Sequence, residues 1–156
     1  MELVVKHFRE LSAEELFDIY KLRVSVFVVE QACPYQEVDD ADKLAYHVFL
    51  KDADGIQAYL RVLPEKAVFD EVSIGRVIAV KRRCGLGTRI VSEGLKVARE
   101  KFGAERIKIE AQTYAKGRYY SRSFVHGGYR PPKILPRTGQ TRLFHKALSH
   151  MSALRS

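Results

Sequence analysis

Residues 82–88 read Arg-Arg-Cys-Gly-Leu-Gly-Thr and join two regular segments of the chain. The apolar run from Val72 to Val80 before them predicts a strand, and the apolar spacing from Leu86 to Phe102 predicts a helix. A strand that passes through glycines into a helix gathers unpaired backbone N–H groups and the positive end of the helix dipole at one point, which favours phosphate binding. Three arginines add full charges there: Arg82, Arg83 and Arg89. The turn therefore predicts a pyrophosphate site, although a basic turn that only caps a helix has the same pattern.

The spacing of the glycines excludes two common nucleotide motifs. A P-loop has a lysine directly after its second glycine, whereas Thr88 follows Gly87. A dinucleotide-binding loop has a third glycine, and Ile90 stands in its place. The remaining pattern, Arg-x-x-Gly-x-Gly, resembles the coenzyme A pyrophosphate loop of the GNAT superfamily of N-acetyltransferases.

Length and composition limit the class of protein. The 156 residues fit a single domain spanning 1–156, and 46% hydrophobic and 29% charged residues are typical of a globular protein. No apolar run approaches the roughly 18 residues of a membrane helix, and the first residues lack a secretory signal, so we expect a cytoplasmic protein with no membrane partner. Cys33 and Cys84 form neither a disulfide framework nor a zinc set, and the histidines lack metal-ligand spacing, so we expect no metal.

The net charge of +8 suits a polyanionic partner. Nucleic acid is one such partner, and coenzyme A, with its 3′-phosphate and pyrophosphate, is another; a solvated basic face is the third interpretation. Positive charge is dense between Arg76 and Arg106, whereas the N-terminal third holds an acidic cluster. The cluster consists of Glu37, Asp39, Asp40 and Asp42. This asymmetry predicts one anion-binding end and one cation-binding end.

The order of the predicted elements indicates an α+β fold. Strands are expected at 2–8, 46–50, 56–63, 72–80, 106–111 and 141–148, with an irregular or edge strand at 129–138. Helices are expected from the capping box of Ser12 and Glu15 to Phe27, over 86–102 with Gly103 as its end, and briefly over 114–122. This order predicts a mixed central sheet of about six to seven strands with helices on both faces. The crossover through the 86–102 helix should be right-handed and make strands 72–80 and 106–111 parallel.

Three further segments carry a specific resemblance. Residues 22–39, Leu-Arg-Val-Ser-Val-Phe-Val-Val-Glu-Gln-Ala-Cys-Pro-Tyr-Gln-Glu-Val-Asp, resemble the signature of the ElaA-like branch of the GNAT superfamily. So do Ile74-Gly75-Arg76-Val77 before the glycine turn and Ala111-Gln112 at the end of the next strand. The resemblance covers about residues 10–120, and the order of elements is also that of the GNAT acyl-CoA N-acyltransferase fold.

The sequence departs from the family pattern in two places. The connection from strand 72–80 to the loop arginine is about two residues shorter than usual, and Arg83 stands where the family has glycine. The family's Phe-Tyr-x-x-x-Gly-Phe is replaced within residues 118–129. Either Ser123-Phe124 stands for Gly-Phe, or a short insertion precedes Gly128-Tyr129, so the resemblance leaves the tyrosine assignment open.

The resemblance implies an N-acetyltransferase that moves an acetyl group from acetyl-CoA directly to a primary amine in a ternary complex. An N–H near Ile78 or Ala79 would polarise the thioester carbonyl, and Tyr119 or Tyr120 would protonate the leaving thiolate. The residues implied to contact the coenzyme are Ile78, Ala79, Val80, Arg82, Arg83, Cys84, Gly85, Leu86, Gly87, Thr88 and Gln112.

The acceptor amine is expected beside the segment that follows the first helix, where GNAT proteins build this site. Its implied contacts are Glu30, Gln31, Cys33, Tyr35 and Arg76, and the carboxylates of the segment favour a small cationic amine. Three carboxylates are candidate general bases, among which the sequence does not choose: Glu37, Glu71 and Glu110.

Two arginines sit at positions that strand and helix periodicity would bury. Arg23 interrupts the apolar face of the first helix, and a buried arginine must be paired. We expect a carboxylate of residues 37–42 to clamp it. Arg76 shares a face with Ile74 and Ile78 by strand alternation, so it needs a partner or a cavity.

Two other functions stay open at this point. An acyl-CoA-binding sensor without turnover fits a chain with no evident base and an altered tyrosine segment. A basic nucleic-acid-binding module would use residues 116–122, Lys-Gly-Arg-Tyr-Tyr-Ser-Arg, although no recognised nucleic-acid motif frames them. We expect a small-molecule amine and no nucleic acid as partner. GNAT proteins are commonly dimers, so a homodimer is one expectation, although no feature of the sequence requires it.

Overall fold

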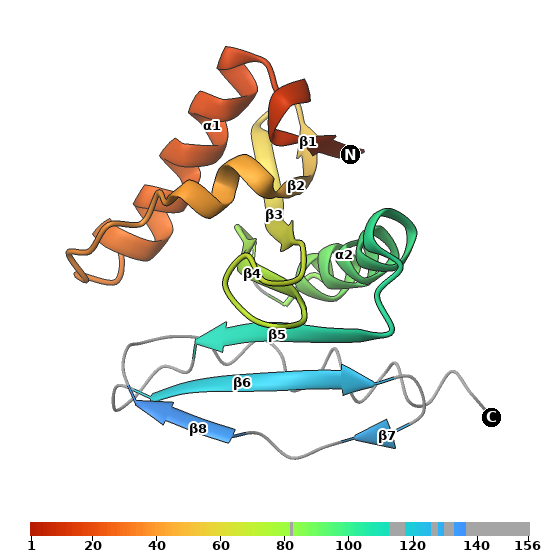
Figure 1. Ribbon diagram of the computed structural model, residues 1–156. Helices are drawn as coiled ribbons and strands as arrows, with labels where there is room; N and C mark the ends of the chain where they lie inside the picture. Colours follow the sequence, from red (N-terminus) through yellow and green to blue (C-terminus); the bar gives the residue numbers. More distant parts are fainter. Residues whose placement is uncertain (82, 113–117, 126–127, 130–132, 137–156) are drawn as a thin grey trace.

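The computed structural model describes residues 1–81, 83–112, 118–125, 128–129 and 133–136. These residues form one mixed sheet with helices packed on its two faces (Figure 1). The strands are β1 (Glu2–His7), β2 (Tyr46–Asp52), β3 (Gly55–Leu63), β4 (Val72–Ala79), β5 (Arg106–Gln112), β6 (Arg118–Val125), β7 (Gly128–Tyr129) and β8 (Lys133–Pro136). The helices are α1 (Ala13–Val24) and α2 (Leu86–Phe102), with short helical turns η1 (Phe8–Glu10), η2 (Ser25–Val29) and η3 (Asp40–Leu44).

The sheet is parallel at one point only among the described strands. Strands β1 to β4 pair antiparallel in sequence order, β4 and β5 pair parallel, and β6 pairs antiparallel with β5, β7 and β8. The predicted parallel pairing of residues 72–80 with 106–111 is thus confirmed, with α2 as the connection. The described sheet has eight strands rather than six to seven, because the chain after β5 contributes three.

The first helix begins at the predicted capping box. The Ser12 hydroxyl accepts a hydrogen bond from the Glu15 N–H at 3.1 Å, and the Glu15 carboxylate accepts one from the Ser12 N–H at 2.9 Å. Helix α1 continues directly into η2, a π-helical turn. Ile19 and Phe27 are buried on one face of the sheet, so the helical segment reaches Phe27 as predicted.

The strands divide their apolar side chains between the two helices. One apolar cluster joins alternate strand residues to α2, and the other joins the intervening residues to α1 and η2. Helix α2 lies close to the sheet at Gly94, where a Cβ atom would lie 2.8 and 2.9 Å from the two Cδ atoms of Leu60. The helix ends at Gly103 with a φ of +61°, which confirms the predicted glycine cap.

Strand β4 has a bulge at its centre. Two β4 residues, Arg76 and Val77, lie opposite the single β3 residue Leu60. Arg76 has a φ of +55°, in the left-handed region that residues other than glycine rarely adopt. Simple alternation put Ile74 and Ile78 on one face, and this is wrong. The bulge shifts the alternation, so Ile74 packs on the α2 side and Ile78 on the α1 side.

The short helix expected over 114–122 is wrong for residues 118–122, which belong to β6. Strand β6 pairs with the whole of β5, from Arg106–Val125 to Gln112–Tyr119, and so satisfies the backbone groups on that edge of β5. The edge strand expected within 129–138 is present as β8. The strand expected at 141–148 lies outside the described residues. No helix in the described part of the chain is both long and apolar enough to cross a membrane.

Candidate functional site

The β4–β5 pair defines the centre of the candidate site. The two strands pair at three positions among the described residues, from Val72–Ile107 to Ile74–Ile109. Strand β4 nevertheless continues to Ala79 and β5 to Gln112. We call the region between Gly75–Ala79 of β4 and residues 110–112 of β5 the fork. The edges of both strands that face the fork carry backbone groups that this pairing does not use.

The β3–β4 ladder fixes which β4 groups face the fork. The Val80 N–H donates to the Gln57 carbonyl at 2.9 Å. Hydrogen-bonded and non-bonded pairs alternate along an antiparallel ladder, so Ile78 also bonds to β3 and Ala79 does not. Of the two N–H groups considered from the sequence, the one on Ala79 is therefore directed away from β3, towards the fork.

The glycine turn lies at the open end of the fork. Gly85 caps α2 with a φ of +80°, and Arg83 has a φ of +63°. The Arg89 N–H bonds to the Gly85 carbonyl, so the preceding N–H groups of α2 have no partner within the helix. A Cβ atom on Gly87 would lie 4.0 Å from the Cβ atom of Ala79, which puts the start of α2 beside the end of β4. Arg82 lies outside the described residues.

The turn residues are accessible. Arg83, Cys84, Gly85 and Thr88 are exposed, Gly87 is half-buried, and Leu86 is buried beneath them. The Cys84 thiol donates to the Lys81 carbonyl at 3.0 Å, so it bonds back to the chain before the turn. Val80, also predicted to contact the coenzyme, is exposed at the end of β4.

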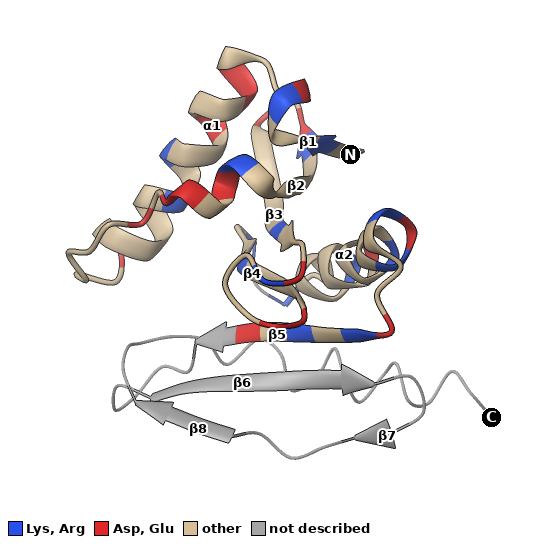
Figure 2. Cartoon of the chain, in the orientation of Figure 1, with Lys and Arg blue, Asp and Glu red and all other residues tan. Residues whose placement is uncertain are grey.

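Three arginines and three carboxylates form an ion-pair cluster beside the fork. Glu37 and Asp42 both pair with Arg23, at 3.0 and 2.7 Å, and Arg23 is fully buried. This confirms the predicted clamp. Two further arginines complete the cluster: Arg61 pairs with Asp39 and Asp42, and Arg76 pairs with Glu37 and Asp39. Figure 2 shows the acidic residues gathered on the segment between α1 and β2.

Charge pairing holds the cluster in its ionised form. Burial alone would raise the pKa of Asp42, but hydrogen bonds and charge from Arg23 and Arg61 bring it below its ordinary value. Burial opposes the charge of Arg23, yet the neighbouring Tyr59, Asp42 and Glu37 raise the Arg23 pKa. The positive and negative charges of the cluster balance. Glu37, Asp39 and Asp42 therefore leave little unpaired negative charge to attract a cationic ligand.

A neutral histidine lies under this cluster. The two ring nitrogens of His47 contact the Tyr59 hydroxyl at 2.8 Å and the Asp42 carbonyl at 3.1 Å. Because a carbonyl only accepts, Nε2 donates to Asp42 and Nδ1 accepts from Tyr59. Burial is the main reason that the pKa of His47 falls to about 4. His47 therefore acts as a fixed hydrogen-bonding link between β2, β3 and η3.

The structure brings two of the predicted acceptor residues together. The Arg76 guanidinium lies 6.0 Å from the ring centres of both Tyr35 and Phe27. Arg76 is 14% exposed and Tyr35 lies at the surface. Of the remaining three, Glu30 is exposed at the end of η2, and Gln31 and Cys33 are half-buried in the turn that follows.

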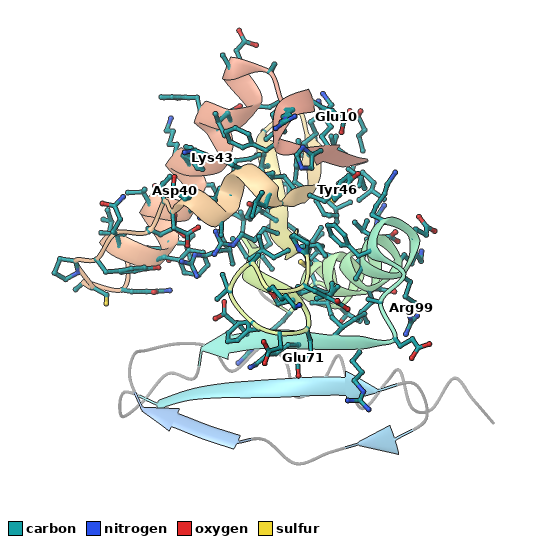
Figure 3. The ribbon with its side chains drawn as sticks, viewed as in Figure 1. Glu10, Asp40, Lys43, Tyr46, Glu71 and Arg99 are labelled. Atoms are coloured by element: carbon teal, nitrogen blue, oxygen red, sulfur yellow. The ribbon has the colours of Figure 1, made fainter. Side chains whose placement is uncertain are left out.

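The three candidate bases lie in different surroundings. Both oxygens of Glu37 accept hydrogen bonds from arginine, at 2.6 to 3.1 Å. Glu71, labelled in Figure 3, lies directly before β4, at the end of the β4–β5 pair opposite to the fork. Glu110 directly follows the last β5 residue that pairs with β4.

The tyrosines expected after β5 lie on β6. Tyr119 is opposite Gln112, and Tyr120 is opposite Ala111. The short helix expected over 114–122 does not carry them, because the chain forms a strand there. The register still brings both residues to the end of β5 that borders the fork. Their role as acid stays a prediction.

The sequence indicates that part of the ion-pair cluster is buried, but it does not indicate which residues pair. Arg61 is the one charged residue of the β3 segment, so its charge indicates a buried partner, as for Arg23. Which carboxylate it meets depends on the β2–β3 and β3–β4 registers, which the sequence does not state. In the sequence, the position of Tyr59 indicates only an aromatic residue of the core. Its contacts with His47 and Arg23 depend on the same strand registers.

Known proteins that are similar to this chain include the following three. The UPF0039 protein of Schizosaccharomyces pombe is 38% identical over 128 residues, 80% of this chain and 84% of that protein. Protein ElaA of Escherichia coli is 32% identical over 123 residues, 76% of this chain and 80% of ElaA. The crystal structure of ElaA matches with a TM-score of 0.66 over 72% of this chain and 78% of that one. An acyl-CoA N-acyltransferase structure from Pseudomonas aeruginosa is 34% identical, with a TM-score of 0.67 over 72% and 79% of the two chains. No protein-family model matches the sequence.

The mixed sheet, the fork and the glycine turn define the fold of the GNAT acyl-CoA N-acyltransferases. Within that superfamily, the chain belongs to the family of ElaA and the UPF0039 proteins.

Proposed function

We propose that this protein is an acetyl-CoA-dependent N-acetyltransferase that acts on a small primary amine. The observation that carries the proposal is the fork, together with the start of α2 beside its end at Ala79. A strand edge with unused backbone groups suits the two amides of a pantetheine arm. An adjacent helix start with unpaired N–H groups suits a pyrophosphate. The fork and the helix start follow one another as the pantetheine arm and the pyrophosphate do along coenzyme A.

In this proposal the chain's own groups hold the coenzyme. The N–H groups of Leu86, Gly87 and Thr88 bind the pyrophosphate, and Arg83 adds a cation at its exposed rim. The glycine at 87 lets the phosphate approach the helix backbone closely. The fork-facing groups of Ala79 and the neighbouring β4 residues align the pantetheine arm. Gln112 borders the opposite side of the fork.

The chemistry requires a neutral amine and a polarised thioester. A primary ammonium has a pKa near 10 in water, so it must lose a proton before its nitrogen can attack the carbonyl carbon. The Ala79 N–H, directed to the fork, donates to the carbonyl oxygen as negative charge develops there. The leaving thiolate takes a proton from Tyr119 or Tyr120.

The acceptor side is formed by the segment after η2. Tyr35 and Arg76 lie together there, and Glu30 is exposed nearby in sequence. Because arginines balance Glu37, Asp39 and Asp42, the preference for a cationic acceptor rests on Glu30 and Glu110. We therefore propose a compact amine that enters between this segment and the fork.

The test is release of free thiol from acetyl-CoA with a panel of amines, run with acetyl-CoA and longer acyl-CoA donors. Gly87→Ala tests the pyrophosphate site. Its added methyl group would contact only Ala79 in the described structure, at an ordinary contact distance, so the fold should tolerate it. We expect turnover with one amine class, weaker acetyl-CoA binding in Gly87→Ala, and loss of rate in one of Tyr119→Phe and Tyr120→Phe. Binding without turnover would move the protein to the sensor function. Failure to bind any acyl-CoA would overturn the proposal, and salt-dependent binding of nucleic acid instead would favour the nucleic-acid module.

A further inference from the structure

Glu110 lies where the fork opens. It directly follows Ile109, the last β5 residue that pairs with β4. Its side chain is 27% exposed, so a ligand in the fork can reach it. A carboxylate at this point can exchange protons with a reacting group between the two strands.

Glu110 also lies on the acceptor face of the sheet. Ile109 packs on the α2 side, and successive residues of a strand face opposite sides, so Glu110 faces the side that carries α1. The Arg76 guanidinium, 4.0 Å from the Glu110 carboxylate, faces the same side and pairs with Glu37. The carboxylate is thus on the same side as the segment proposed to bind the acceptor.

Gly75 makes room for this carboxylate beside the bulge. A Cβ atom on Gly75 would lie 2.9 Å from Oε2 of Glu110, closer than Cβ atoms normally approach. The Glu110 side chain therefore crosses towards β4 at the residue before Arg76. The carboxylate borders the stretch of β4 backbone that faces the fork.

The other two candidate carboxylates are unsuited to accepting a proton in the fork. Glu37 is buried, and arginine N–H groups occupy both of its oxygens. Protonating it would remove one of the two carboxylates that neutralise the buried Arg23. Glu71 lies directly before β4, at the end where β4 and β5 are paired. The fork begins only after Ile74, three residues further along the chain.

We propose that Glu110 is the general base that deprotonates the acceptor ammonium, directly or through one water. This inference rests on the proposed N-acetyl transfer. The ammonium gives one proton to Glu110, and the nitrogen lone pair then forms the C–N bond to the thioester carbon. As the C–S bond breaks, the sulfur takes the electron pair and the hydroxyl proton of Tyr119 or Tyr120, and the second proton of the nitrogen restores that hydroxyl. The overall reaction releases one proton, which passes from Glu110 to water.

Few charged groups surround Glu110 among the described residues. Arg76 approaches it from β4, and Lys108 lies two positions earlier on the same face of β5, with its ammonium over the Phe69 ring. On β6 the residue opposite Glu110 is Ser121.

The test compares Glu110→Gln with Glu105→Gln, which changes an exposed glutamate just before β5. We expect Glu110→Gln to lower kcat/KM for the amine at least about 100-fold near neutral pH. The variant's rate should then rise with pH towards the amine's own pKa of about 10. Acetyl-CoA affinity should stay within about twofold in both variants. Glu105→Gln should keep the wild-type rate and pH profile.

Gly75→Ala gives an independent variant without a change of charge. Its methyl group would displace the Glu110 carboxylate, the far end of a flexible side chain, so we expect a lower rate with acetyl-CoA binding retained. If Glu110→Gln does not fold, this variant decides. A wild-type rate and pH profile in either folded variant would overturn the role of Glu110 and leave the N-acetyltransferase intact. A wild-type protein that binds acetyl-CoA but acetylates no amine would overturn both.

Discussion

The Nε atom of Arg76 donates a hydrogen bond to Oε1 of Glu37 at 2.6 Å. Arg23 binds the same carboxylate at 3.0 to 3.1 Å. Glu37 thus links helix α1 to the bulge of β4. Arg76 has a positive φ, which costs about 1 kcal/mol or more for a residue with a side chain. The ion pairs hold this strained residue in place beside the fork.

We expect Glu37→Ala to destabilise the protein by at least about 3 kcal/mol, because it leaves the buried guanidinium of Arg23 with a single carboxylate partner. The measurement is urea unfolding followed by circular dichroism. Asp40→Ala is the control. Asp40 pairs with Lys43 at the surface (Figure 3), and its removal should change stability by less than about 0.5 kcal/mol. A Glu37→Ala effect as small as that of Asp40→Ala would contradict the structural role of the clamp.

Arg83 can be tested by two substitutions that remove the same charge. Arg83→Gly should be more stable than Arg83→Ala by about 1 kcal/mol, because the φ of +63° suits glycine and strains alanine. Both should weaken acetyl-CoA binding to the same degree if the guanidinium acts only as a cation. Equal stability of the two variants in thermal unfolding would show that the turn relaxes when Arg83 is replaced.

Two glycines of α2 should respond differently to alanine. Gly94→Ala places a methyl group 2.8 to 2.9 Å from Leu60, and we expect it to destabilise the protein by about 1–3 kcal/mol. Gly87→Ala has room, so its stability should be unchanged or slightly higher, since alanine favours the helix. Chemical unfolding of both variants measures the difference. A Gly94→Ala protein as stable as wild type would mean that α2 shifts outward at little cost.

The buried His47 predicts a pH dependence of stability. Its pKa is lowered from 6.5 to about 4 in the folded protein, so the unfolded chain binds a proton that the folded chain does not. The contribution of His47 to the free energy of unfolding is at its full value above pH 6.5. It falls by on the order of 3 kcal/mol as the pH drops to 4. The lowered pKa of Asp42 also stabilises the folded protein, and this contribution is lost only as the pH falls below the ordinary carboxyl pKa of 3.8.

Proton NMR of the His47 ring checks this directly. The ring signal should stay that of neutral imidazole through pH 6 in the folded protein and should titrate near 6.5 in urea. A folded-state titration near 6.5 would mean that the ring reaches water, contrary to its full burial.

Local signals in the sequence were sufficient for much of the fold. The Ser12–Glu15 capping box and Gly103 mark helix ends because side chains or a left-handed residue satisfy the terminal backbone groups there. The segment at 118–122 carried no such signal. It forms a strand because the edge of β5 must be paired, and that requirement is tertiary.

The candidate site was predictable only in part, for the same reason. The buried Arg23 demands a carboxylate, and the acidic segment after the helix was the one able to supply it. The bulge at Arg76 could not be foreseen, because two residues opposite one is a property of strand register. Without the bulge, strand alternation put Arg76 on one face with both Ile74 and Ile78, whereas it shares a face only with Ile78. The choice among Glu37, Glu71 and Glu110 likewise depended on where β4 and β5 cease to pair.

The short contact between β4 and β5 has a mechanical consequence. Three residue pairs make up the backbone pairing that joins the antiparallel ladder of β1–β4 to that of β5–β8 within the described sheet. An extended ligand that bonds to both edges beyond Ile74 would act as an additional strand and brace this joint. Amide hydrogens of Val77 and Ala79 should then exchange more slowly with ligand than without it. The co-substrate would serve as part of the architecture as well as part of the reaction.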